Sequence, residues 1–204
     1  MFQLLYLPSM LVKTYGSAVY GISAQLITVE VDVGQGAKTQ IIGLPDNAVK
    51  ESQPRINAAM KNSGFTYPRK GVVINMAPAD IRKEGSAYDL TTAIGVMAAG
   101  ELIHTDLLEE TIIMGELSLD GGLLPIKGAL PIAIQANKDG FKKLILPKEN
   151  AREAAIVTGL EVYGLETLKE VIQLLQGEKE FDRTIVNPRD EFAENVTHMT
   201  YDFS

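Results

Sequence analysis

Asn75-Met-Ala-Pro-Ala-Asp-Ile-Arg-Lys-Glu-Gly-Ser-Ala-Tyr-Asp-Leu90 is a polar stretch that lies between two apolar runs. The run before it, residues 71–75, is short and rich in β-branched residues, which is typical of a buried strand. The run after it, residues 90–99, predicts a buried helix. The sequence thus places a charged loop between two core elements, and such loops on rigid scaffolds are common sites of function.

This loop contains five candidate functional residues. Ser86 is either a nucleophile, which needs an activating base nearby, or the N-cap of the following helix. Asp89 is expected to be a structural carboxylate near the helix start, where the helix dipole favours negative charge. The other three form either a ligand or subunit contact or an ordinary solvated surface: Arg82, Lys83 and Glu84.

Two motifs resemble the proteolytic domain of Lon. In that family a Lys-Asp-Gly-Pro-Ser-Ala-Gly loop carries the catalytic serine, and the matching run here is Lys83-Glu-Gly-Ser-Ala87. The alignment places Ala87 at the serine position and Ser86 one residue early. The run Leu124-Pro-Ile-Lys-Gly-Ala-Leu130 resembles the turn before the catalytic lysine and places Leu130 at the lysine position. The resemblance implies an α/β fold of the ribosomal protein S5 domain 2-like type, as in the Lon protease C-terminal domain, without the catalytic dyad.

A relocated dyad of Ser86 and Lys127 is the peptidase alternative. A Ser–Lys dyad requires the amine within hydrogen-bond distance of the hydroxyl. A shift of one residue at a helix start turns a side chain by about 100°. We therefore expect no catalytic residues in this chain.

Three longer motifs resemble a different family. They are Tyr15-Gly-Ser-Ala-Val-Tyr-Gly21, Ile42-Gly-Leu-Pro-Asp46 and Met114-Gly-Glu-Leu-Ser-Leu-Asp-Gly-Gly-Leu-Leu-Pro-Ile-Lys-Gly128. The chain is similar over most of its length to the N-terminal domain of ComM/YifB proteins, also described as magnesium chelatase-like AAA+ proteins. The resemblance implies a ring-forming ATPase that acts in DNA branch migration during natural transformation, with this domain serving assembly or DNA guidance. A magnesium-chelatase-type subunit is the alternative that the family description implies.

The resemblance also implies the domain organisation and cofactors. We expect an extension at residues 1–9, a Lon-like domain at 10–176, and an acidic linker at 177–204 that leads towards an AAA+ module. The run Gly34-Gln-Gly-Ala-Lys-Thr39 lacks the spacing of a phosphate loop and precedes a predicted strand. No cofactor is therefore expected in this chain, whereas ATP and Mg²⁺ are implied for the full-length family.

Composition limits the remaining possibilities. The chain has 204 residues, 46% of them hydrophobic, which is ample for a core. It has no Cys, which rules out disulfides and cysteine-based metal sites, so a cytoplasmic location is expected. It has two His, which excludes a histidine-rich metal centre. No apolar run reaches membrane-spanning length.

The net charge of −7 disfavours a dedicated nucleic-acid binder, which usually has a basic footprint. One local exception is a group of cations with Phe65 and Tyr67 between them, because aromatic rings and cations together suit single strands. These candidate contacts for single-stranded or branched DNA are Lys61, Arg69 and Lys70. Ordinary solvated surface is the alternative.

The pattern of apolar and polar residues also predicts the remaining strands and helices. A strand at 12–20 is expected to contain a tight turn at 15–17, and a half-buried strand at 24–33 is expected to form a hairpin with 39–42. A helix at 46–62 should break at Pro54. A strand at 111–117 should turn at 120–122, and Glu116 and Asp120 there are either an acid–base or Mg²⁺ pair or a solvated face. Alternating strands and helices over 128–175 predict βαβ units.

Overall fold

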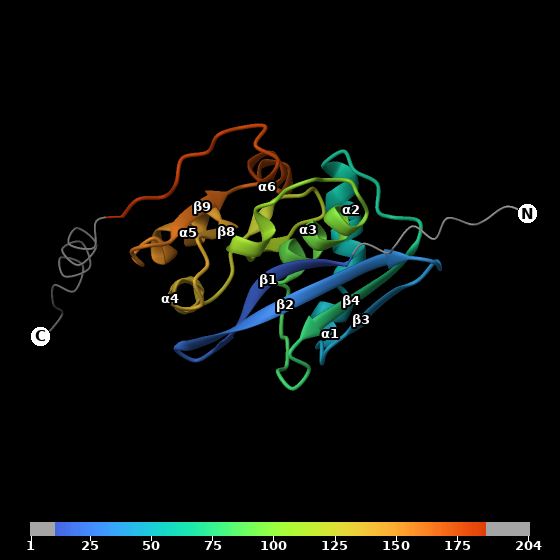
Figure 1. The fold of residues 1–204 in the computed structure, drawn as a ribbon, viewed down its shortest axis with the longest axis horizontal. Helices are drawn as coiled ribbons and strands as arrows, with labels where there is room; N and C mark the ends of the chain where they lie inside the picture. The colour runs from blue at the N-terminus through green and yellow to red at the C-terminus, as the bar shows by residue number, and fades with distance from the viewer. Residues whose placement is uncertain (1–10, 187–204) are drawn as a thin grey trace, which may run out of the picture.

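The computed structural model describes residues 11–186, so the expectations for residues 1–9 and 187–204 lie outside the described residues. The main sheet contains β1 (Val12–Tyr20), β2 (Ser23–Gly34), β3 (Thr39–Ile42), β4 (Gly71–Ala77), β5 (Thr111–Ile113), β8 (Lys143–Pro147) and β9 (Glu161–Leu165). Its strand order is β3-β4-β2-β1-β5-β8-β9 (Figure 1). A second, two-stranded sheet contains β6 (Glu116–Leu117) and β7 (Leu123–Leu124).

The helices are α1 (Asn47–Lys50), α2 (Ser52–Asn62), α3 (Asp89–Ala99), α4 (Ala129–Lys138), α5 (Lys148–Ala154) and α6 (Leu168–Leu175), with a 3₁₀ turn at Leu108–Glu110. Every residue of α3 is buried. Gly95 allows this helix to approach the sheet closely, because a Cβ at that position would lie 2.8 Å from Val31 Cγ2. α3 is therefore the central core element, as the sequence predicted.

The four N-terminal strands are mostly antiparallel. β1 pairs with β2, and β2 pairs with β4. The alternation predicted for β2 is confirmed, since Ile27, Val29 and Val31 are fully buried. The turn predicted at residues 15–17 is wrong, because β1 is continuous there. Gly16 instead provides room for α3 and β5, where an added Cβ would lie 2.9 Å from Met114 Sδ.

The predicted hairpin between the second strand and residues 39–42 is also wrong. β3 pairs in parallel with β4, so that Thr39 lies beside Val72. The turn between β2 and β3 passes over the start of β4, where a Cβ on Gly71 would lie 2.5 Å from Gln35 O. The close approach of this turn to Gly71 places β3 at the outer edge of the sheet, beyond β4.

Two further elements, a helix break and a strand, differ in position from the prediction. The helix break predicted at Pro54 occurs at Glu51, and Pro54 lies in the first turn of α2, where its missing N–H costs little. The strand predicted at 111–117 divides into β5 and β6, which belong to different sheets. The division occurs at Gly115, whose N–H donates to Ala87 O at 2.9 Å and whose carbonyl accepts from Leu90 N at 3.0 Å.

The C-terminal half confirms the predicted βαβ units. β5, β8 and β9 are parallel neighbours, connected through α4 and α5. α3 packs against the sheet face that carries Thr14, whereas Gly128, just before α4, lies against Val19. Residues 14 and 19 point to opposite faces of a strand, so α3 and α4 cover different faces of the sheet.

The start of the expected linker is attached to the domain. Gln173 O accepts a hydrogen bond from Glu178 N at 2.9 Å, and Val162 O accepts one from Thr184 N at 2.7 Å. Phe181 packs against the core, with Lys179 Nζ 4.6 Å from its ring centroid. None of the helices among residues 11–186 is long and apolar enough to cross a membrane.

Candidate functional site

Lys83 is the most deeply buried charged residue of the candidate loop. Its relative exposure is 0%, and its Nζ donates to Gly43 O at 2.8 Å and to Pro78 O. Burial lowers the pKa of the Lys83 ammonium, and the nearby charge of Asp80 opposes that shift. Lys83 therefore does not belong to an exposed ligand or subunit surface, and its ammonium instead connects two backbone segments.

The backbone of the same residue strengthens this connection. Lys83 N donates to Leu44 O at 3.3 Å, and Lys83 O accepts from Asp46 N at 2.9 Å. The Asp46 carboxylate caps α1 through Val49 N at 2.8 Å and also accepts from Gly85 N at 3.0 Å. Asp46 was missed as a site residue, although an Asp just before a helix start is a recognisable N-cap signal.

Gly43 and Leu44 form the other side of this connection. Gly43 has φ +98°, and a Cβ there would lie 2.1 Å from Met76 O. Leu44 also has a positive φ, +59°, which costs energy for a side chain of this size. The Ile42-Gly-Leu-Pro-Asp46 motif therefore packs directly against β4 and the candidate loop.

Asp89 anchors the other end of the loop. It is 1% exposed and receives two hydrogen bonds from Arg55, Nε to Oδ2 at 2.8 Å and Nη2 to Oδ1 at 3.0 Å. Leu117 N also approaches Oδ2 at 3.5 Å. Burial raises the pKa of the Asp89 carboxyl, and the bonds from Arg55 oppose that rise. Arg55 was missed by sequence reasoning, because nothing local links residues 34 positions apart.

Ser86 is not the N-cap of α3, since Tyr88 occupies that position. The Ser86 hydroxyl donates to Glu116 Oε2, and its carbonyl accepts from Asp89 N at 3.0 Å. A serine nucleophile needs a base that can take its proton and is itself held in place by a third group. In the described part of the chain, neither a lysine nor a histidine hydrogen-bonds to Ser86.

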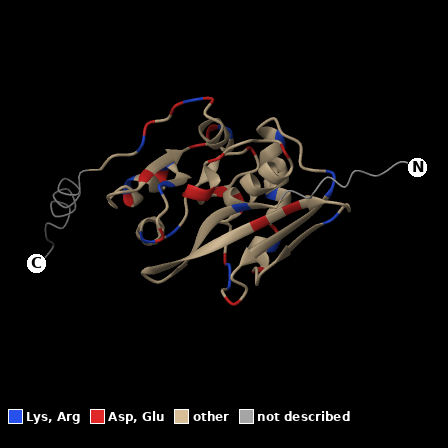
Figure 2. Cartoon of the chain, in the orientation of Figure 1, with Lys and Arg blue, Asp and Glu red and all other residues tan. Residues whose placement is uncertain are grey.

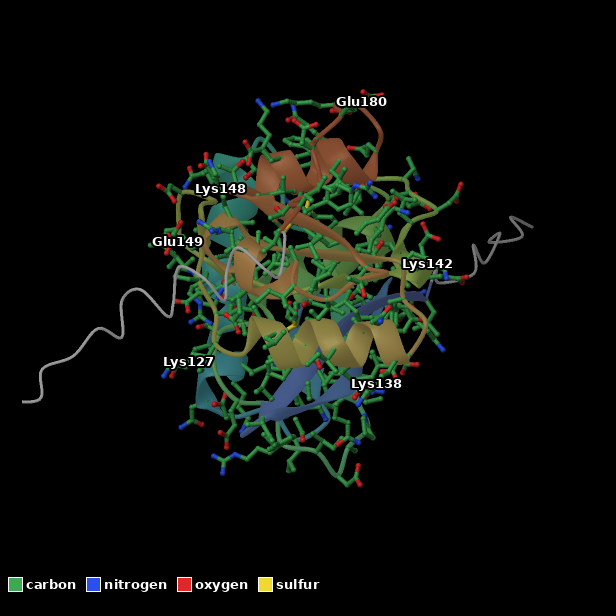
Figure 3. All side chains as sticks on the ribbon, turned by 90° about the vertical axis from the view of Figure 1, so that its left-hand side faces the viewer. Lys127, Lys138, Lys142, Lys148, Glu149 and Glu180 are labelled. Carbon is green, nitrogen blue, oxygen red and sulfur yellow. The ribbon has the colours of Figure 1, made fainter. Side chains whose placement is uncertain are left out.

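The positions that correspond to the Lon dyad have structural contacts. Ala87 O accepts from Gly115 N at 2.9 Å, and Leu130 N donates to Glu153 Oε1 at 2.9 Å. Lys127 is exposed, and Figure 3 shows its side chain directed outward from the edge of the molecule. The structure therefore does not bring Ser86 and Lys127 together as a relocated dyad.

The tip of the loop is exposed to solvent. Arg82 Nε lies 3.1 Å from Glu84 Oε1, and both side chains are well exposed. Tyr20 Oη donates to Arg82 O at 2.9 Å, which joins the loop to the β1–β2 hairpin. An exposed pair of this kind contributes little to stability. Separating these two charges would therefore cost the domain little stability.

The candidate DNA contacts lie on the surface but lack a stacking platform. Lys61, Arg69 and Lys70 are exposed. Phe65 and Tyr67 pack against the core, and Tyr67 Oη lies 3.1 Å from Thr39 Oγ1. The aromatic part of the predicted nucleic-acid surface is therefore not available for stacking on bases.

A fourth cation, Lys38, joins Arg69 and Lys70. Lys38 O accepts from Val72 N at 3.1 Å, so the turn that contains Lys38 lies beside the start of β4. Lys38 was missed because the sequence did not predict that the turn packs against residues more than thirty positions later.

Acidic pairs in the described residues do not gather into a metal site. Glu116 bonds to Ser86, whereas Asp120 Oδ1 accepts from Ser118 Oγ and from Gly122 N at 3.1 Å. Within residues 11–186 no group of three or more His, Cys, Asp or Glu could hold a metal ion. The carboxylates of the β6–β7 hairpin therefore have local structural contacts.

Comparison with known proteins gives a clear family assignment. The family model described as "Subunit ChlI of Mg-chelatase" matches residues 29–150. The chain is 38% identical over 166 residues to the competence protein ComM of Haemophilus influenzae, covering 81% of this chain and 32% of that protein. It is 37% identical over 182 residues to the uncharacterized protein YifB of Escherichia coli, covering 89% and 35%.

The chain belongs to the magnesium chelatase-like ComM/YifB family. It spans about a third of the length of these relatives. It is also 28% identical over 197 residues to Lon protease 2 of Bacillus subtilis, covering 86% of this chain. With the mixed seven-stranded sheet, this similarity confirms the predicted Lon-like fold in a ComM/YifB family member.

Replacing the buried lysine tests its structural role. Lys83→Ala removes the donor for two carbonyls and leaves a cavity, so the free energy of unfolding should fall by about 3 kcal/mol. Urea denaturation measures this change, and Lys127→Ala, at an exposed lysine, should stay within about 0.5 kcal/mol of the parent. Equal stabilities of the two variants would contradict the structural role.

The burial of Tyr88 predicts a pH dependence of stability. Burial raises the pKa of the Tyr88 phenol well above its usual range, and the charges of Asp46 and Glu84 add to the rise. The unfolded chain releases this proton near pH 10 while the native chain keeps it, so stability should fall as pH rises further. In denaturation at pH 9 and 11, Tyr88→Phe should lose about 1 kcal/mol less than the parent. An identical loss in both proteins would show that Tyr88 is not responsible.

Proposed function

We propose that this chain is the non-catalytic N-terminal domain of a ComM-like AAA+ ATPase and that its role is assembly. One observation supports this most directly: the loop that resembles the nucleophile loop of Lon is fixed by structural bonds. By the resemblance to Lon, Ala87 corresponds to the serine position and Leu130 to the lysine position. In the same loop Lys83 is fully buried, and its ammonium donates to the carbonyl of Gly43. A loop fixed in this way suits a rigid part that contacts other subunits.

The activity of the full-length protein is proposed from the family. The relatives extend well beyond the region that this chain matches, and one of them is named a competence protein. We propose a cytoplasmic, ring-forming motor that uses ATP and Mg²⁺ and acts on branched DNA during natural transformation. The alternative is a magnesium-chelatase-type subunit. The match to the family model described as "Subunit ChlI of Mg-chelatase" supports this alternative.

The turn at residues 34–39 does not fit the phosphates of a nucleotide. The glycine-containing turn at residues 34–39 connects β2 to β3, whereas a phosphate loop connects a strand to a helix that binds phosphate at its N-terminus. ATP binding is therefore proposed for the part of the relatives that this chain does not match.

DNA guidance is the second candidate role. It is favoured by three exposed cations that form no ion pair within residues 11–186: Lys38, Arg69 and Lys70. It is disfavoured by the net charge of −7 and by the packed aromatic rings beside them. Nucleic-acid affinity depends mainly on cations that neutralise phosphates. The net negative charge of this chain therefore argues for assembly rather than for DNA binding.

Fluorescence anisotropy of labelled single-stranded and forked DNA distinguishes the two roles. At low and moderate salt the parent chain should show no saturable binding, and a Lys38→Ala, Lys61→Ala, Arg69→Ala, Lys70→Ala variant should give the same curve. Salt-sensitive binding that this variant loses would contradict the assembly role and assign DNA guidance to the domain.

A further inference from the structure

β3 is the open edge of the main sheet. The strand order ends at β3, and no other strand among residues 11–186 lies beyond it (Figure 1). The opposite edge, β9, is partly covered by the chain itself, since Val162 O accepts a hydrogen bond from Thr184 N at 2.7 Å. An edge strand without a neighbour presents unpaired backbone groups with which another chain can pair.

The register shows which backbone groups of β3 are unpaired. β3 runs parallel to β4, with Thr39 beside Val72. Val72 N donates to Lys38 O, so alternate residues over 38–42 bond to β4. The N–H and C=O groups of Thr39 and Ile41 therefore point away from the sheet. The edge thus offers donors and acceptors at alternate residues, which is the spacing that an added strand requires.

The sequence of β3 does little to prevent such pairing. Natural edge strands are often protected by a charge, a proline or a bulge. β3 is Thr39-Gln-Ile-Ile42, a short strand of four residues that contains neither a charged residue nor a proline. Threonine and isoleucine also favour strands. The composition of this edge therefore suits the addition of a further strand.

Exposed apolar side chains lie beside the open edge. Val73 of β4 is 39% exposed and lies on the sheet face opposite to α3, since Val72 and Ile74 on either side of it are buried. Ile42 of β3 is 50% exposed and pairs with Asn75, which shares that face with Val73. Ile42 and Val73 are therefore diagonal neighbours on one accessible face.

Leu44 extends this apolar surface just beyond the end of β3. Its side chain is 53% exposed although its φ of +59° costs energy, and such strain is common where a residue serves a function. Lys83 holds the segment in place, because its backbone N–H donates to Leu44 O and its ammonium donates to Gly43 O. A surface that is already ordered loses less entropy on binding. We call Ile42, Leu44 and Val73 the apolar patch.

Cations gather at the other end of the same edge. Lys38 immediately precedes β3, and Arg69 and Lys70 immediately precede β4, whose start lies beside that of β3. All three are exposed and form no ion pair within the described residues, and Figure 2 shows basic residues at this end of the sheet. Asp32 lies on β2, on the far side of β4 from this edge. We call Lys38, Arg69 and Lys70 the basic group.

We propose that the edge of β3 binds an extended segment of a partner protein as an added strand. The backbone of Thr39 and Ile41 supplies the hydrogen bonds, and alternate apolar side chains of the segment cover the apolar patch. Carboxylates at the end of the segment beside Lys38 pair with the basic group. In strand addition, backbone bonds give affinity and side chains give specificity. The proposal goes beyond the assembly role and does not depend on it.

An acidic, apolar peptide fits this edge better than a nucleic acid does. DNA would contact the basic group but would leave the apolar patch uncovered. The aromatic rings on which its bases would stack, Phe65 and Tyr67, are packed against the core. A peptide strand uses the unpaired backbone groups, the apolar patch and the basic group together.

Fluorescence anisotropy with the 204-residue chain tests the proposal. The probes are a labelled peptide in which a run of glutamates precedes alternating valine and threonine, and a peptide of the same composition in reverse order. The order that places its glutamates beside Lys38 should bind the parent with a dissociation constant that rises with salt. Ile41→Pro removes an outward N–H donor but no bond to β4, and should weaken binding at least about tenfold. Urea denaturation shows whether this variant is folded.

Two further variants make the test independent of the proline. Arg69→Glu with Lys70→Glu should weaken binding of the glutamate peptide at least about tenfold. The same variant should bind a version with lysines in place of the glutamates more tightly than the parent does, because opposite charges again meet. Ile42→Asn should weaken binding without changing its salt dependence, since it removes apolar contact alone.

Matched controls place the same changes at exposed positions elsewhere. Lys127→Glu with Lys138→Glu, before and at the end of α4, and Leu119→Asn should bind the peptide like the parent (Figure 3). Failure of both peptides to bind in low salt, or binding that a folded Ile41→Pro variant retains, would overturn strand addition. Displacement of the peptide by a more tightly bound single-stranded oligonucleotide would assign the surface to nucleic acid instead. Self-association that Ile41→Pro abolishes would assign the edge to a second copy and overturn the partner protein.

Discussion

The rest of the loop depends on the two hydrogen bonds that the Lys83 ammonium group donates. A fully buried lysine is costly unless its hydrogen bonds are satisfied, and here the carbonyls of Gly43 and Pro78 accept from it. These bonds join the segment before α1 to the segment after β4. With the capping bonds of Asp46 and the pair between Arg55 and Asp89, they hold the loop at both ends.

The same scaffold supports different functions through small changes in a loop. By the resemblance to Lon, Ala87 corresponds to the position of the nucleophile, and Ser86, one residue earlier, bonds to Glu116. The charges that remain accessible are on the loop tip, Arg82 and Glu84, and at the far end of the sheet. A domain whose interior charges are fixed and which keeps accessible charges on its surface is suited to the assembly role proposed above.

Sequence alone predicted the elements with strong periodicity. The alternation of β2, the buried α3 and the βαβ units of the C-terminal half were all evident from local patterns. The parallel placement of β3 beside β4 was not, because it depends on a glycine contact between distant residues. In the site, Asp89 was expected to be structural, but its partner Arg55 and the burial of Lys83 result from tertiary packing that no local pattern encodes.

Native-state hydrogen exchange tests most directly whether the loop is fixed rather than poised for chemistry. The amides of Asp46, Lys83 and Gly85 donate to Lys83 O, Leu44 O and Asp46 Oδ2, respectively. If these bonds form one structural unit with the core, the three amides should exchange only with opening free energies close to those of β2 and β4. Exchange at the rate of an exposed loop, with β2 and β4 still protected, would contradict the account.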